Sequence, residues 1–232
     1  MSIFTTASAV CPTCGTTCTL EYPSSINADR RPDLRAAILD HSLFTLPCRG
    51  CGEILTFEPH ITYLDMVRGQ WILAGSVDEV ENWRAAESAA VQVHRRTFGP
   101  DAPAAARALG AALTPRLVFG WPALIEKLLC QELGLDDTSL EALKLAIVRD
   151  GPLRDLDATQ ELRVRGRTGD SLDFAWADPV SGAVSARFSV PESAYAVVKG
   201  GDDWAALRQR LAGPMYVDMN RVLRDAAPDA AG

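Results

Sequence analysis

The feature that most constrains this chain is a pair of Cys-x-x-Cys motifs near its start, each followed by a glycine. A two-residue spacer lets both sulfurs of one turn face the same point, and the glycine permits the left-handed backbone that closes the turn. Two such turns supply the four tetrahedral sulfurs that zinc takes in structural sites. The sequence therefore predicts one zinc ion bound by the thiolates of Cys11, Cys14, Cys48 and Cys51.

Two other roles for these cysteines stay open. In the first role, Cys11 and Cys14 form a redox pair, since a Cys-x-x-Cys motif lowers a thiol pKa. A thioredoxin-type motif opens a helix, however, whereas TTCTLEY predicts a strand, and this role leaves the second pair unexplained. In the second role, the cysteines are free thiols that bind no metal. Of the remaining thiols, we expect Cys18 to pack beside the first turn, where it is a weaker candidate ligand, and Cys130 to lie in an apolar helix face.

A zinc ion with four cysteine ligands has no open coordination position, so the predicted site is structural. The three histidines, His41, His60 and His94, are far apart and match no metal motif. The sequence also contains no P-loop, GxGxxG, GxSxG or HExxH pattern. These observations lower the expectation of an enzyme without excluding one.

Beyond the cysteines, several stretches resemble the CpXC-domain family of bacterial proteins. They are CPTCG, EYPSSINADRRPDLRAAILDHSLFTLPCRGCGE and TYLD within residues 1–75, and LIEKLLCQELGLDDTSLEALKLAIV within about 116–148. The second motif departs from the family pattern because it lacks the proline, but it keeps both ligands. The resemblance implies a zinc-binding module and no particular biochemical activity.

The predicted fold class is α+β. Residues 1–75 are expected to form a zinc ribbon-like module with a small antiparallel sheet and a helix at Pro32–Leu39. Residues 76–150 read as mainly helical, with capping boxes at Ser76–Glu79 and Thr138–Glu141 and with Asp136 and Asp137 as capping residues. Residues 151–224 predict an antiparallel meander of ELRVRGR, SLDFAWAD and AVSARFSV, AYAVVKG as a possible fourth strand, and a helix at about 202–211. Residues 225–232 are expected to be a disordered tail.

The formal net charge of −7 disfavours unspecific binding to nucleic acid or anionic lipid. One basic stripe is the exception: Arg163, Arg165 and Arg167 share a predicted strand face, with Arg187 on a later strand. The stripe is a candidate contact for phosphate or an acidic partner, but the pattern favours the solvated face of a half-exposed sheet.

The sequence favours a zinc-binding interaction or adaptor protein whose partner is another protein. A nucleic-acid-binding zinc ribbon in transcription or RNA machinery is the first alternative, and a thiol-disulfide oxidoreductase using Cys11 and Cys14 is the second. No apolar run is long enough to span a membrane, and MSIFTTASAV does not match a signal peptide, so we expect a cytoplasmic protein.

Overall fold

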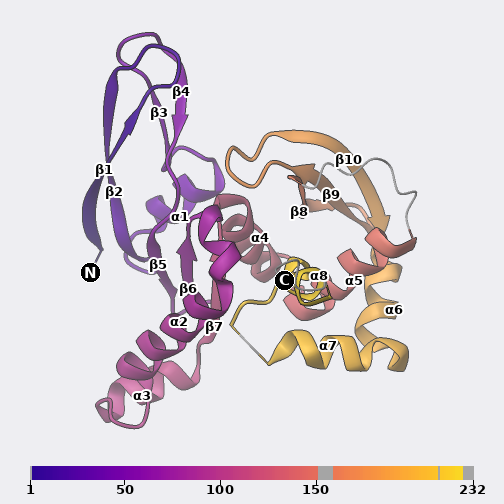
Figure 1. Cartoon of the computed structure of the whole chain (residues 1–232). Coiled ribbons are helices and arrows are strands. Elements are labelled where there is room, and N and C mark those ends of the chain that lie inside the picture. The colour runs from indigo at the N-terminus through magenta and orange to yellow at the C-terminus, as the bar shows by residue number, and fades with distance from the viewer. Residues whose placement is uncertain (1, 151–158, 214, 227–232) are drawn as a thin grey trace, which may run out of the picture. The chain divides into compact units, whose positions relative to one another are not determined.

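The computed structural model describes residues 2–150, 159–213 and 215–226. The chain divides into two compact units, residues 1–125 and 126–232, which are taken separately below. The α+β class predicted from the sequence is confirmed (Figure 1). None of the helices in the described residues has the length and apolar character needed to cross a membrane.

The first unit is built on a five-stranded sheet in the order β1-β2-β5-β6-β7. β1–β2 and β5–β6 pair antiparallel, whereas β2–β5 and β6–β7 pair parallel. The sheet is thus mixed, and it reaches past the predicted module of residues 1–75. Its strands are β1 (Ile3–Val10), β2 (Thr17–Asn27), β5 (Ile61–Asp65), β6 (Gln70–Gly75) and β7 (Thr114–Phe119).

The two parallel pairs require long crossover connections. The first crossover contains α1 (Pro32–Leu39), at the predicted bounds, and the hairpin of β3 (Thr45–Pro47) and β4 (Ile54–Thr56). The second contains a 3₁₀ helix, η1 (Val77–Asn82), then α2 (Trp83–Phe98) and α3 (Ala104–Ala111).

The predicted capping box at Ser76–Glu79 is wrong. The Ser76 side chain makes no capping hydrogen bond to the backbone and instead donates to the nearby carboxylate of Asp78. A 3₁₀ turn therefore forms where the sequence pattern predicts the start of an α-helix, and α2 begins seven residues after Ser76.

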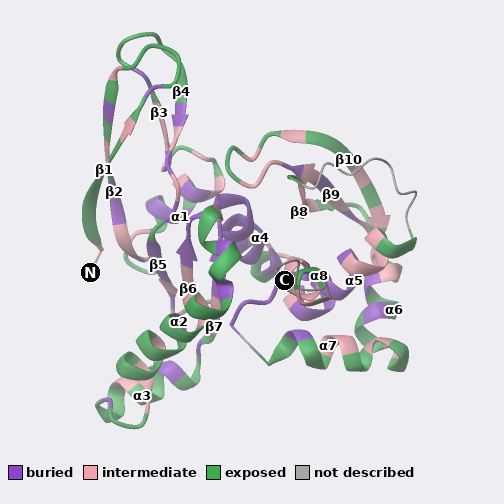
Figure 2. Ribbon diagram, viewed as in Figure 1, coloured by how far each residue is buried: buried purple, intermediate pink, exposed green. Residues whose placement is uncertain are grey.

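The core of the first unit lies on the central strands, which are mostly buried, whereas β1 is largely exposed (Figure 2). The largest buried side chain is Trp121, at the start of α4 (Trp121–Glu132). Its ring stacks on Phe44 with centroids 4.2 Å apart, and its indole N–H donates to the carbonyl of Phe57. Both partners flank the β3–β4 hairpin, so this contact anchors the base of the hairpin.

The second unit contains the predicted three-stranded antiparallel meander, in the order β10-β9-β8. Leu162, Val164, Leu172 and Phe174 bury the inner face of this sheet. Its strands are β8 (Glu161–Thr168), β9 (Ser171–Ala177) and β10 (Val184–Pro191). Its remaining elements are α5 (Asp137–Asp150), α6 (Glu192–Gly200), η2 (Asp202–Trp204), α7 (Ala205–Ala212) and α8 (Met219–Ala226).

The segment AYAVVKG is not a fourth strand. It lies in α6, where Tyr195 and Val198 are buried three residues apart on one helix face.

The start of α5 is capped by Asp136, whose Oδ1 accepts a hydrogen bond of 2.8 Å from the amide of Ser139. The predicted capping role of Asp136 is therefore confirmed, but the predicted capping box at Thr138–Glu141 is not formed. The predicted tail lies outside the described residues except for its first two, which end α8.

A cluster of buried charged side chains joins four segments of the second unit. Each member is at most 3% exposed. The members are Glu126 and Lys127 of α4, Glu141 and Lys144 of α5, Arg163 of β8, and Asp218 before α8.

Arg163 lies at the centre of this cluster. Its Nη1 is 2.8 Å from Glu126 Oε2 and 2.7 Å from Asp218 Oδ2. Lys144 Nζ lies 2.9 Å from Glu126 Oε2 and 2.8 Å from Glu141 Oε2. Burial raises the pKa of Asp218, but the charges of Arg163 and Lys144 outweigh this and hold its pKa well below the usual range. Each buried charge therefore depends on the others for compensation.

Backbone groups near the C-terminus complete the cluster. Lys127 Nζ donates to the carbonyl of Val217 at 2.6 Å, and the amide of Met219 donates to Glu141 Oε2 at 2.9 Å. The segment before α8 is thereby fixed against α4 and α5.

We expect Arg163→Met to lower the free energy of unfolding by about 3–5 kcal/mol, because it leaves buried carboxylates without their partner. Arg167→Met is the matched control on the same strand: Arg167 is 32% exposed and pairs with Glu192 at 2.9 Å. It should cost at most about 1 kcal/mol. Urea denaturation of both variants measures the difference, and equal losses would contradict the importance of the buried cluster.

Candidate metal centre

Each Cys-x-x-Cys motif forms a tight turn with the same backbone hydrogen bonds. In the first, the amide of Cys11 donates to the carbonyl of Thr16 and the amide of Gly15 donates to the carbonyl of Cys11, both at 2.9 Å. In the second, Cys48 donates to Glu53 at 2.7 Å and Gly52 to Cys48 at 2.8 Å. The two turns therefore share one geometry, although only the first contains a proline.

The glycine after each motif has the left-handed conformation that the sequence predicts. The φ angle is 72° at Gly15 and 80° at Gly52. Side chains other than glycine rarely adopt this region, so these residues allow the chain to turn back toward the sulfurs.

A different constraint acts at Gly50, inside the second motif. A Cβ atom at this position would lie 2.4 Å from Thr16 Oγ1 and 3.1 Å from Cys14 Sγ. The Gly50 amide also points at Cys48 Sγ, at 3.4 Å. The two turns thus approach each other closely at Gly50, the residue after Arg49, which stands where the first motif has its proline.

The turns bring the four predicted sulfurs together. Cys11 Sγ lies 3.6 Å from Cys51 Sγ, Cys14 Sγ lies 3.5 Å from Cys48 Sγ, and all four ligand atoms are within 4.8 Å of one another. A disulfide would need a separation of about 2.05 Å. Four sulfurs at about 2.3 Å from a tetrahedral zinc ion would be about 3.8 Å apart. The arrangement therefore fits a single metal ion much better than a disulfide.

The centre is buried on one side only. Cys11 and Cys48 are 1% and 3% exposed, whereas Cys14 and Cys51 face solvent. The buried pair packs with Cys18, Leu55 and Phe57 in a small apolar cluster. Cys18 is thus a packing residue beside the group of four sulfurs, and Cys130 belongs to the core of the second unit.

The two exposed thiols have opposite electrostatic tendencies. Hydrogen bonds with the side chain and the backbone of Thr16 lower the pKa of Cys14 to about 6. A hydrogen bond from the backbone of Glu53 favours the Cys51 thiolate, but the neighbouring thiols, with Cys14 first, raise the pKa of Cys51 to about 12. Ionisation of one thiol thus disfavours ionisation of the next, and a bound cation would relieve the repulsion between the thiolates.

A comparison with protein-family models matches residues 9–144 to the family described as CpXC protein. The match covers more than half of the 232 residues and includes all four clustered cysteines. The chain belongs to the CpXC family. A search of curated proteins and a search of solved structures each gave no match.

The predicted basic stripe does not form a single exposed surface in this CpXC protein. Arg163 is 2% exposed and held among carboxylates, so its assignment to a phosphate-binding stripe is wrong. Arg165 is half-buried, and Arg167 pairs with Glu192. The strand also contains a register shift between Val164 and Gly166, which breaks the two-residue alternation on which the prediction depends. The sequence signal for this arrangement was Glu126 in the apolar run LIEKLLC, because a carboxylate on a buried helix face needs a cation nearby.

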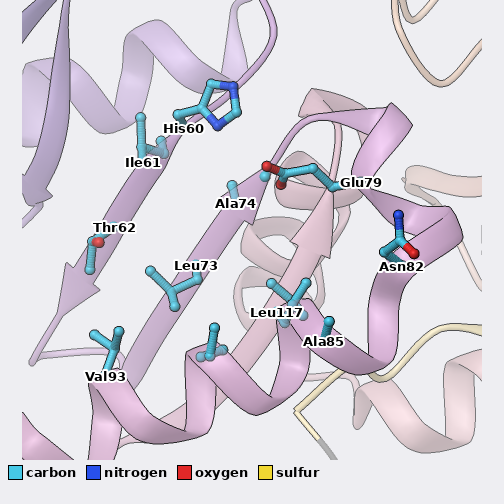
Figure 3. Close-up of a pocket in the computed structure, with 14 residues that line it drawn as sticks. His60, Ile61, Thr62, Leu73, Ala74, Glu79, Asn82, Ala85, Val93 and Leu117 are labelled. Atoms are coloured by element: carbon cyan, nitrogen blue, oxygen red, sulfur yellow. The ribbon is translucent and has the colours of Figure 1, made fainter.

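Sequence reasoning also missed a pocket of about 470 Å³ between α2 and strands β5, β6 and β7 (Figure 3). Alanines of α2 face Leu73 and Leu117 of the sheet, and their short side chains leave the space open. The polar residues His60, Glu79 and Asn82 lie at the exposed margin. The pocket is a surface hollow separate from the cysteines.

Gly50→Ala should destabilise the first unit by about 1–3 kcal/mol, because the added methyl group overlaps Thr16 and Cys14. Gly166→Ala is the control: a Cβ there meets nothing within 4 Å, and its effect should stay within about 1 kcal/mol. Thermal unfolding followed by circular dichroism compares the two. Full stability of Gly50→Ala would contradict the close approach of the turns.

Proposed function

We propose that this CpXC protein binds one structural zinc ion through Cys11, Cys14, Cys48 and Cys51, and that the stabilised module acts as an adaptor for a protein partner. The observation that carries the metal site is that four sulfurs lie within 4.8 Å of one another. They come from two turns whose first cysteines, Cys11 and Cys48, are 37 residues apart in the sequence. A set of four thiolates fits zinc, with iron as the other common metal for this geometry.

The role is structural because the ligand set is complete. Four protein ligands leave no position for a water or substrate, which a catalytic zinc requires. The ion would tie the β1–β2 hairpin to the β3–β4 hairpin, whose strands have three residues each. Hairpins of this size are at best marginally stable alone, so metal binding would contribute directly to folding.

An exposed apolar side chain close to the second turn is available to a protein partner. Ile54 follows the second turn and is 59% exposed, beside the exposed Cys51. The net charge of −7 and the burial of Arg163 both weaken the alternative of nucleic-acid binding.

Elemental analysis of the purified chain should find one zinc ion per chain. Cys48→Ser should lose the metal and lower the melting temperature of the first unit, because it removes a ligand. Cys130→Ser is a matched control, since Cys130 lies outside the four-sulfur group. It should keep the metal.

The same samples distinguish the redox alternative. A metal-free wild-type chain with a reversible disulfide between Cys11 and Cys14 would replace the structural role with thiol chemistry. Iron in place of zinc would keep the site and change the ion.

For the partner, a photo-crosslinking residue at position 54 should capture a protein in cells, and the same residue at position 67 should not. Val67 is a suitable control because it is 82% exposed and lies in a different turn. Adding Cys48→Ser should abolish capture at position 54. Equal capture at both positions would argue against an interface at the zinc module.

A further inference from the structure

The strand at the margin of the five-stranded sheet is open to solvent. β1 pairs with β2 on one side, and no other strand of the described residues lies on its outer side. Phe4 is 44% exposed and Val10 is 64% exposed, and Figure 2 shows β1 as largely exposed. An edge of this length can accept another strand.

The direction of the backbone groups follows from two contacts at the ends of β1. The carbonyl of Ile3 accepts a hydrogen bond from Ser24, and the amide of Cys11 donates to Thr16, so odd-numbered residues direct their backbone groups toward β2. Alternate residues of a strand point to opposite sides. The amides and carbonyls of the even-numbered residues therefore face the open edge.

This edge lacks the usual protection against pairing. Natural edge strands carry charges, prolines or bulges that block a second strand. The sequence of β1, IFTTASAV, has neither charge nor proline, and its register irregularity places the extra residue on β2. The open side of β1 is therefore compatible with a neighbouring strand.

The sequence of β1 is complementary to itself in one antiparallel register. A twofold axis at Ala7 places Phe4 opposite Val10, and Thr6 opposite Ser8, of a second copy. Aromatic–β-branched pairs and hydroxyl pairs are among the cross-strand contacts that stabilise sheets. The even-numbered residues that meet in this register are also those whose backbone groups are free to exchange hydrogen bonds. Moving the axis to Thr6 would place Phe4 opposite Ser8 and lose the apolar pair.

We propose that two copies of this chain associate through their β1 edges, antiparallel about Ala7, to form one continuous sheet. No like charges meet in this register, since none of the paired residues is ionisable. This association depends on the β1 strand and does not require a bound metal.

Sedimentation equilibrium of the full chain tests the proposal. The wild type should show a concentration-dependent mass approaching twice 25.0 kDa. Thr6→Pro should be monomeric, because proline removes an outward N–H and no bond to β2. A monomeric wild type at every concentration would overturn the proposal, as would a Thr6→Pro dimer as tight as the wild type.

Two double variants test the register. Phe4→Lys with Val10→Lys places like charges opposite each other and should weaken dimerisation by roughly tenfold or more relative to Phe4→Lys with Val10→Glu, which places opposite charges there. Both pairs lose the same apolar contacts, and their melting temperatures show whether the monomer is intact. Equal dimerisation by the two double variants would overturn the register.

Discussion

Four sulfur atoms converge in a part of the molecule where the apolar core is small. Leu55 and Phe57 join the buried cysteines in a compact cluster, and four partly buried apolar residues pack against it: Ala7, Ala9, Leu20 and Leu46. The β3 and β4 strands are too short to be stable as an isolated hairpin. At the base of the same hairpin, Phe44 stacks on Trp121, so the hairpin is fixed at one end by aromatic packing and at the other by the cysteines.

The second unit uses a different kind of constraint. Its core combines an ordinary apolar cluster with a set of fully buried charges. Such a set costs desolvation energy, and well-packed apolar residues of similar size often replace one without loss. We interpret its role here as directional: Arg163 donates to Asp218, Glu141 accepts from the amide of Met219, and each of these hydrogen bonds requires a particular geometry. The charges therefore select one path for the segment before α8.

Local features of this fold could be predicted from the sequence, and long-range ones could not. The cysteine turns, α1 and the three-stranded meander depend on residues close together in the chain, where spacing and turn residues determine the conformation. The parallel pairing of β2 with β5 depends on strands separated by a crossover, which no local pattern encodes. Arg163 was misplaced for the same reason, because its partners Glu126 and Asp218 lie 37 and 55 residues away.

The separation of these contacts along the chain bears on synthesis by the ribosome. All four clustered cysteines lie between residues 11 and 51, so their site can assemble before the second unit is translated. The buried charges complete their contacts later, because Lys127 donates to the carbonyl of Val217 and Glu141 accepts from the amide of Met219. Until those residues emerge, these side chains lack the hydrogen bonds that Val217 and Met219 supply. The final docking step of the second unit therefore comes only after the segment before α8 has left the ribosome.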